Sequence, residues 1–393
     1  MKSTAVPGRF ARTEAQRAHP AAADGMRVLA VGIVGWYHIW QQSWVGGGRL
    51  DFIVRTGAVW VDMMILLSAF CLYLPYANAR AAHLPEPDAS PLRFWKKRAV
   101  RILPSYYFNL AAALCVAVAA KGIPAHFAQD LAAHLTLTQT LFRWPYFYTS
   151  LNGVTWTVSM LAQFYLLFPL LVRGLRRAPA AVLGGMLLVQ ALWRRYALSH
   201  SEDALYPMLF NQLPAFGSVL ALGLAGAAAY AWLSRRPALA GFWPRLGFTA
   251  LGIAGLRLVV WFQRQLSTAR NMQLWQLENR TALGAAFLLA LLGLALGLPL
   301  PGKRLWLFLS GLSYNFYLWH QLLALWMKYM LRIPAWTGNI PPNQTGDIVW
   351  MRQFNAQCWV LALGAAVLCT YLIEKPAARR LNRCGRHPQK VNV

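Results

Sequence analysis

Apolar residues run along this chain in ten stretches that are separated by shorter polar segments. Most of the stretches approach the roughly 20 residues that a helix needs to cross the hydrocarbon core of a bilayer. The pattern therefore predicts an all-α integral membrane protein, a polytopic bundle of about ten transmembrane helices. The predicted spans are residues 28–45, 58–77, 105–120, 154–172, 180–193, 210–233, 246–262, 281–300, 305–327 and 356–373.

Two regions depart from this pattern. The fifth span is short and is expected to extend into its flanks. Between the third and fourth spans, the segment HFAQDLAAHLTLTQTLF at 126–142 is expected to form a helix lying in the membrane interface. No repeat or linker marks a second domain, so we divide the chain into a cytoplasmic tail at 1–26, a transmembrane domain at 27–376 and a basic cytoplasmic tail at 377–393.

The composition agrees with a membrane protein. Hydrophobic residues make up 58% of the chain and charged residues 13%, and the mean hydropathy is +0.38, which is not the profile of a soluble protein. Four of the five cysteines lie in apolar stretches and one in the basic tail, so no spacing suggests a disulfide framework or a metal site. We expect no metal and no tightly bound cofactor.

The formal net charge of +26 raises the question of a nucleic-acid ligand. With the N-terminus inside, 25 of the 38 Lys and Arg residues fall in inner segments, 12 fall in outer segments and Arg257 lies within a span. This bias predicts that both termini are cytoplasmic. No nucleic acid is needed, because anionic lipid headgroups or an anionic cytosolic ligand suffice as partners. The first apolar stretch starts late and carries polar groups, so we interpret it as a retained span.

The first predicted span carries two polar groups that are costly in hydrocarbon. Eleven residues separate Arg27 from His38, which places the imidazole ~16 Å deeper on a helix. Eleven residues are also close to three turns, so both side chains lie on one helix face. Ionisable groups inside a membrane are usually functional, and one ligand along this face could touch both.

Four more polar side chains are predicted at the depth of His38, in the outer half of the bilayer. They are Asp62, Ser159, Gln163 and His320. In one interpretation Asp62 orients an imidazole, which then takes a proton from a hydroxyl or attacks a carbonyl. In the alternative, Asp62 pairs with Arg257 or caps a helix, and the other polar groups only hold helices together.

A basic cluster precedes the third predicted span, at the inner face. Arg98 and Arg101 are spaced i, i+3, so on a helix they point the same way and could clamp a phosphate together. The alternative is a positive-inside stop signal. The presence of Arg27 on the same membrane face favours the phosphate site.

Six short segments together form the strongest signal in the sequence. They are DGMRVLAV (24–31), WVDMMILLSAF (60–70), RAVRILPSYY (98–107), WTVSMLAQFYLLFPLL (156–171), SYNFYLWH (313–320) and IEKP (373–376). In this order they resemble the motifs of the membrane acyltransferase 3 family, the bacterial O-acyltransferases that modify cell-surface glycans and other hydroxylated acceptors. The resemblance extends over most of the chain.

The resemblance implies acyl-CoA, with acetyl-CoA as the default, used from the cytosol as co-substrate. The acceptor is expected to be a glycan, a glycolipid or another hydroxylated molecule at the outer face of the bacterial cytoplasmic membrane. In this interpretation Arg27, Arg98 and Arg101 hold the CoA phosphates. His38 and Asp62 act on the transfer, with His38 as base or nucleophile. We predict an acceptor-side or supporting role for Trp156, Ser159, Gln163, Arg257 and His320.

The chain departs from the family pattern where the family usually has acidic residues. Leu161 and Ala162 stand where a glutamate usually follows the W-x-x-S pattern, and Ala215 replaces the acid of the R-L-P-E-F segment. The acceptor or its activation is therefore expected to differ from that of other members. We expect a stand-alone acyltransferase without the fused SGNH domain that often follows in this family.

Two functions from other classes compete with the enzyme. A secondary transporter of an anionic solute would also carry charges inside the membrane. A non-catalytic partner in an envelope-assembly complex would explain the missing acids. The sequence shows no pair of Gly/Pro-broken spans in corresponding halves, which disfavours the transporter. The sequence does not specify the oligomeric state.

Overall fold

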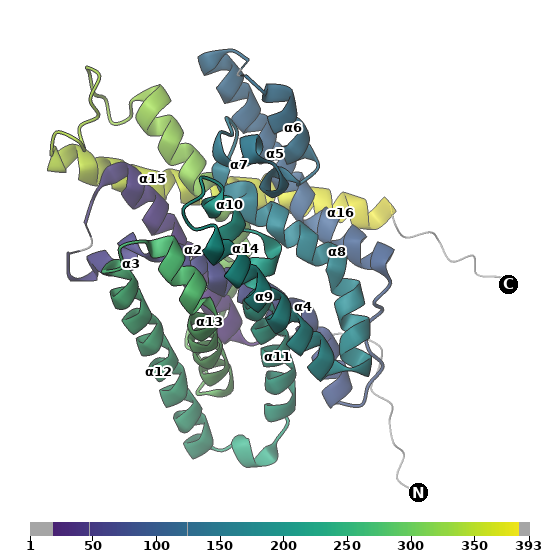
Figure 1. Cartoon of the computed structure of the whole chain (residues 1–393). Coiled ribbons are helices and arrows are strands. Elements are labelled where there is room, and N and C mark those ends of the chain that lie inside the picture. The colour runs from purple at the N-terminus through teal and green to yellow at the C-terminus, as the bar shows by residue number, and fades with distance from the viewer. Residues whose placement is uncertain (1–18, 47, 124, 385–393) are drawn as a thin grey trace, which may run out of the picture.

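A computed structural model describes residues 19–46, 48–123 and 125–384. Within these ranges the secondary structure is helical and contains no strand, so the predicted all-α fold is confirmed. Figure 1 shows long helices packed side by side, with short helices at their connections.

Each of the ten predicted spans coincides with one long helix. These helices are α2 (Ala21–Ser43), α4 (Trp60–Ala81), α5 (Pro91–Lys121), α8 (Trp156–Arg177), α9 (Pro179–Ser199), α11 (Gly217–Leu233), α12 (Phe242–Ser267), α13 (Met272–Leu296), α14 (Lys303–Leu325) and α15 (Ile348–Cys369). The short helices are α3 (Asp51–Arg55), α6 (Phe127–Leu135), α7 (Arg143–Phe147), α10 (Tyr206–Phe210) and α16 (Lys375–Cys384). Two π-helical segments, η7 (Trp326–Leu331) and η8 (Thr370–Glu374), extend α14 and α15.

Seven helical segments in the described part of the chain are long and apolar enough to cross a membrane. The helices α2, α9 and α14 are not among them, although they have 23, 21 and 23 residues. Polar residues such as Arg27 and His38 in α2 lower the hydropathy of these helices. The chain is a multi-pass membrane protein, whereas the count of ten spans and the cytoplasmic side of both termini stay predictions.

Local sequence signals set several helix ends. The Asn271 side chain accepts a hydrogen bond from the Leu274 amide at the start of α13, and Asp347 does the same for Trp350 at the start of α15. These are N-caps, which satisfy backbone donors that the first turn leaves without a partner. A proline in the first turn starts α5 and α9, a position where its missing N–H costs nothing.

The helix α2 lies inside the bundle and contacts α4, α13, α14 and α15. The helices α12 and α13 form the most extensive contact of the molecule. Their backbones meet at Gly252 and Gly293, where a Cβ on Gly293 would lie 2.3 Å from the backbone of α12. Small residues allow such close approach, which is how membrane helices gain packing energy.

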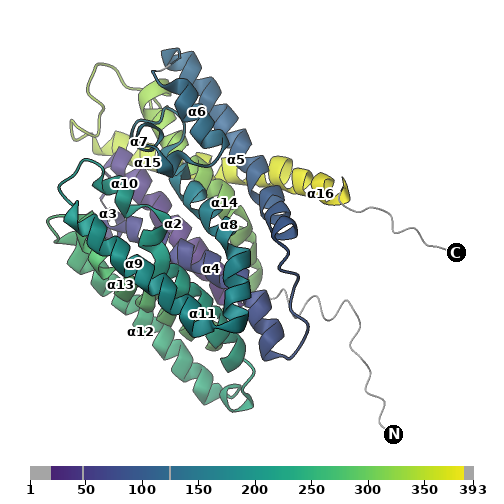
Figure 2. The same cartoon turned by 45° about the vertical axis from the view of Figure 1, so that its right-hand side comes forward.

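Residues 125–155, between α5 and α8, fold into a compact cap at one end of α5, where α6 lies beside it in Figures 1 and 2. Tyr106 and Tyr107 of α5 donate hydrogen bonds to the carbonyls of His134 and Leu135, at 2.8 and 2.9 Å. The helix predicted within 126–142 is thus present as α6. Its position in the membrane interface stays a prediction.

Candidate functional site

His38 of α2 and His320 of α14 lie in direct contact. His38 Nδ1 and His320 Nε2 are 2.8 Å apart, and the ring centroids are 5.0 Å apart. His320 is 1% exposed, whereas His38 is partly exposed. The two histidines of the predicted polar layer therefore meet, and the His38 ring remains partly accessible to a ligand.

The hydrogen bonds of this histidine pair define the position of each proton. His320 Nδ1 lies 3.2 Å from the carbonyl oxygen of Phe316. A carbonyl only accepts, so His320 Nδ1 donates, and the Nε2 of a neutral His320 is an acceptor. His38 Nδ1 then donates to His320 Nε2. The other ring nitrogen of His38, Nε2, keeps its lone pair and can take up a proton.

Aromatic rings fix the orientation of the pair. The Phe316 ring stacks on His320 with centroids 5.7 Å apart, and the Tyr317 ring centroid lies 5.4 Å away. Phe316 fits against α2 because residue 35 is a glycine, where an added Cβ would lie 2.6 Å from the ring. The packing between α2 and α14 thus depends on Gly35.

The structure gives Asp62 a different partner from those that the sequence suggested. Asp62 Oδ2 accepts from Arg280 Nε and Gln276 Nε2, each at 3.3 Å. Asp62 therefore forms an ion pair with Arg280, in place of the expected contact with an imidazole. Both charged groups are buried, at 1% and 0% exposure. The suggested pairing with Arg257 is also corrected, because Arg257 is exposed on α12.

Arg280 connects three parts of the bundle. Besides Asp62 of α4, its Nη1 donates to the carbonyls of Phe210 and Ala215, at 3.1 and 3.2 Å. The guanidinium also lies over the rings of Phe210 and Phe216, 4.3 and 4.1 Å from their centroids, a geometry that favours cation–π attraction. This arrangement is that of a structural brace between α4, α13 and the segment around α10.

Ser159 and Gln163 of α8 both bind Thr140 in the cap. Thr140 Oγ1 lies 3.0 Å from Ser159 Oγ and accepts from Gln163 Nε2 at 2.9 Å. Trp156, one turn earlier, stacks on Phe216 with ring centroids 6.1 Å apart. The supporting residues predicted on α8 therefore hold the cap and the segment before α11, and none of these three contacts involves His38.

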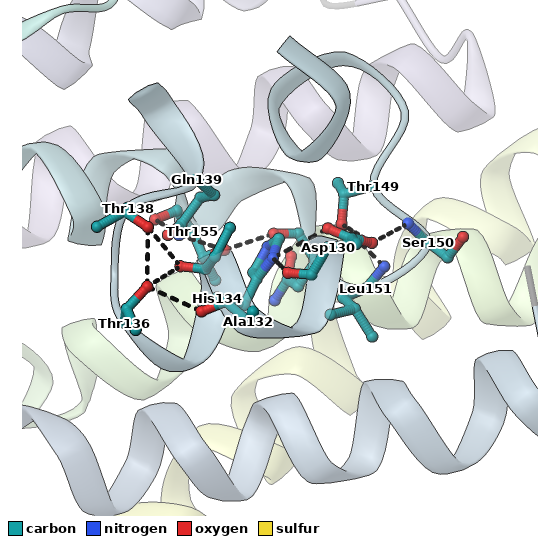
Figure 3. Close-up of polar contacts among 12 residues, drawn as sticks. Asp130, Ala132, His134, Thr136, Thr138, Gln139, Thr149, Ser150, Leu151 and Thr155 are labelled. Atoms are coloured by element: carbon teal, nitrogen blue, oxygen red, sulfur yellow. Dashed lines mark hydrogen bonds and ion pairs between the residues drawn. The ribbon is translucent and has the colours of Figure 1, made fainter. Parts of the chain in front are cut away.

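The cap contains a buried carboxylate–imidazole pair that sequence analysis did not single out. Figure 3 shows Asp130 and His134 together, with Nδ1 and Oδ1 3.1 Å apart, at 2% and 1% exposure. Asp130 Oδ2 also accepts from Thr149 Oγ1 and from the Ser150 amide, at 3.1 and 3.0 Å. Asp130 thus fastens the end of the cap to α6. The i, i+4 spacing of this pair on α6 was the available signal.

Arg27 lies near the start of α2 and has partners on two other helices. Its Nη1 donates to Ser310 Oγ of α14 at 2.8 Å, and its Nη2 lies 3.3 Å from Cys71 Sγ of α4. Asp24, one turn earlier, forms an ion pair with Arg27 at 3.4 Å. The Arg27 side chain is 22% exposed, so part of the guanidinium is accessible to a ligand.

The three predicted donor-site arginines all lie within electrostatic range of one tyrosine of α8, Tyr165. Electrostatic interactions connect the Tyr165 hydroxyl with Arg98, Arg101 and Arg27. Arg98 is partly buried and lies over the Phe94 ring, 5.6 Å from its centroid, and its Nε has no hydrogen-bond partner. Arg101 is exposed. The structure thus brings together three cations from α2 and α5.

The last two motif segments also meet at this arginine cluster. Asn315 of α14 donates from Nδ2 to Thr370 Oγ1 at 2.9 Å and to Glu374 Oε2 at 2.8 Å. Glu374 interacts electrostatically with Arg101. The conformation of η8 is thereby tied to both α14 and α5. Within the described ranges, no group of three or more His, Cys, Asp or Glu side chains could hold a metal ion.

A multi-pass bundle in which one helix, α2, carries both His38 of the histidine pair and Arg27 of the arginine cluster suits a membrane-bound transferase. Comparison with known proteins supports this class: the acyltransferase 3 model, described as an acyltransferase domain, matches residues 21–375. The chain belongs to the acyltransferase 3 family.

One curated relative is similar to part of the chain. Acyltransferase MdmB of Streptomyces mycarofaciens is 28% identical over 198 residues, which cover 49% of this chain and 46% of the relative. The alignment therefore spans less than half the length of that relative. No solved structure matches the chain significantly.

Proposed function

We propose that this protein is an acyl-CoA-dependent O-acyltransferase of the bacterial cytoplasmic membrane. It takes an acyl group, acetyl in the simplest case, from cytosolic acyl-CoA. It places this group on a hydroxyl of a glycan, a glycolipid or a similar acceptor at the outer face. The histidine pair carries the proposal, because it leaves His38 Nε2 as a base on the helix that also bears Arg27.

The reaction can proceed in one step. The acceptor hydroxyl donates its proton to His38 Nε2 while its oxygen attacks the thioester carbonyl carbon. The carbon–sulfur bond then breaks, and the proton on His38 passes to the leaving CoA thiolate. The hydrogen bond from His38 Nδ1 to His320 keeps the ring oriented throughout. A base positioned in this way typically contributes about 10²–10⁴ to the rate.

The arginine cluster supports the use of CoA. Charge-assisted hydrogen bonds make arginine a strong ligand for phosphate, and Arg27 retains an exposed fraction. Arg27 and His38 are ~16 Å apart along α2 by helix geometry. A phosphate-bearing donor at the inner face therefore needs a thin extended arm to present its acyl group to the base, as the pantetheine arm of CoA does.

A transfer assay tests the proposal. The purified protein in lipid nanodiscs is incubated with radiolabelled acetyl-CoA and a total glycolipid and glycan extract of the cell envelope. We expect label in base-labile esters of the extract. His38→Ala should abolish this transfer, whereas His200→Ala, a substitution of another histidine outside the pair, should preserve it. Solute uptake by proteoliposomes without CoA, together with no ester formation, would support the transporter instead.

Rapid quenching separates two versions of the mechanism. In the one-step transfer, labelled donor without acceptor leaves no label on the protein. Label bound to His38 under these conditions would instead support an acyl-histidine relay, in which the imidazole acts as nucleophile. Either outcome keeps His38 at the centre of the reaction, and the measurement decides its role.

A further inference from the structure

A groove of about 280 Å³ opens on the surface of the bundle between α14 and η8. Arg304 and Lys375 provide two cations in its lining, and Leu307, Phe308 and Leu312 provide apolar side chains. It is lined by none of the three arginines of the proposed donor site. The groove therefore combines positive charge with apolar surface, and the proposed acyl transfer uses neither of them.

Along the α14 wall of the groove, charge and hydrocarbon are separated. Arg304 lies in the first turn of α14, whereas Leu307 and Phe308 lie in the next turn and Leu312 in the one after. On the opposite wall, Asn315 binds both Thr370 and Glu374, and Lys375 follows Glu374 directly and also lines the groove. The apolar residues of α14 extend ~12 Å from Arg304 at 1.5 Å per residue.

The groove is formed by fixed backbone features. At Gly311, which lines it, an added Cβ would meet nothing within 4 Å, so the missing side chain leaves open space. The hydrogen bonds from Asn315 to Thr370 and Glu374 hold the π-helical wall against α14. Such π-helical segments occur frequently at functional sites.

Within the groove an aromatic ring holds one cation, and the apolar walls of the groove are exposed. The Lys375 ammonium lies over the Tyr371 ring, 3.6 Å from its centroid. Leu307 and Phe308 are 54% and 46% exposed, so in a bilayer they contact lipid chains. A soluble anion would satisfy the two cations and leave the apolar part without a partner.

We propose that this groove binds an anionic phospholipid. The phosphate and acidic headgroup lie between Arg304 and Lys375, and one acyl chain follows Leu307 and Phe308 across Gly311. The attraction of a basic residue for an anionic lipid surface corresponds to roughly a fivefold change in affinity per cation. A zwitterionic phospholipid is expected to bind more weakly, because its headgroup has no net charge.

Native mass spectrometry of the detergent-solubilised protein tests this site. The protein is titrated with phosphatidylglycerol and, separately, with phosphatidylcholine, and the bound lipid is counted. Arg304→Gln combined with Lys375→Gln should lower phosphatidylglycerol binding at least tenfold. Gly311→Leu should remove the same adduct by filling the groove. Gly184→Leu, at an exposed α9 position with equally open space, should leave it unchanged.

Three results would overturn the proposal. The first is equal phosphatidylglycerol binding in all variants, and the second is equal affinity for the two lipids. The third is a double glutamine variant that loses acetyl-CoA binding and retains phosphatidylglycerol, since the cations would then serve the donor. The melting temperature of each variant in detergent identifies any loss that comes from unfolding, and Gly311→Leu leaves both charges in place as an independent check.

Discussion

Replacing Asp62 by leucine is expected to destabilise the bundle strongly, because it leaves the Arg280 guanidinium buried without a counter-charge. The two side chains are 1% and 0% exposed and 3.3 Å apart. Removing one partner of a buried ion pair typically costs about 3–5 kcal/mol. Asp62→Asn keeps a hydrogen-bond acceptor of similar shape and should cost less, about 1.5–3 kcal/mol for the lost charged hydrogen bond.

The double variant Asp62→Leu, Arg280→Met gives the sharpest test of this brace. It removes both charges, so the uncompensated charge disappears. It also removes the two hydrogen bonds from Arg280 to backbone carbonyls, which cost about 1 kcal/mol each. The double variant should therefore lose less stability than Asp62→Leu alone, and the two substitutions should be strongly non-additive.

Intrinsic tryptophan fluorescence during thermal unfolding in detergent measures this order of stabilities. Arg257→Met is the matched control, because that arginine is exposed on α12, and it should change the stability by less than about 0.5 kcal/mol. The account of the brace fails if Asp62→Leu unfolds at the wild-type temperature. Full stability with abolished acyl transfer would instead restore a catalytic role for Asp62.

Three further substitutions probe the other clusters. Gly35→Ala should push the Phe316 ring and lower kcat about tenfold or more with unchanged donor KM, since a ~1 Å misplacement in an active site is costly; an unchanged kcat would contradict this. Arg98→Ala with Arg101→Ala should raise the donor KM and weaken CoA binding in calorimetry about tenfold or more, and unaltered CoA affinity would remove the donor site. Asp130→Asn should speed amide exchange in the cap it fastens, and unchanged protection would refute that role.

The helices were predictable from the sequence, because a run of apolar residues near 20 is a direct signature of a span. The helices α2 and α14 fall short on hydropathy alone, and they carry His38 and His320. The spacing of His38 from Arg27 in α2 and the family-like segment SYNFYLWH in α14 drew attention to these two histidines. The contact between the two histidines was not predictable, because the sequence does not state which helices are neighbours.

The partner of Asp62 was missed for a physical reason. The span predicted to begin at residue 281 is part of α13, which begins at Met272. Its first turns carry polar residues, so Arg280 was assigned to an outer connection. Those polar turns are buried by other helices, and Arg280 is 0% exposed. Hydropathy shows where a helix meets lipid and does not show where it continues inside protein.

The role of the predicted Ser159 and Gln163 pair also depended on tertiary structure. Both sit on α8 at a spacing of four residues, which placed them on one face. Their common partner, Thr140, lies in the short 3₁₀ helix Gln139–Leu141 of the cap, and the sequence does not show that this segment packs against α8. The π-helical segment η8 was also not predictable, because no residue pattern of the chain indicated it.

The central claim is that His38 removes the proton from the acceptor hydroxyl. The most direct measurement compares acyl-transfer rates of the wild type, His38→Ala and His200→Ala at saturating acyl-CoA, with correct folding of each variant verified. The account predicts a loss of at least about 10²-fold for His38→Ala, with CoA affinity retained and the control unaffected. A folded His38→Ala protein that transfers acyl groups at the wild-type rate would contradict it.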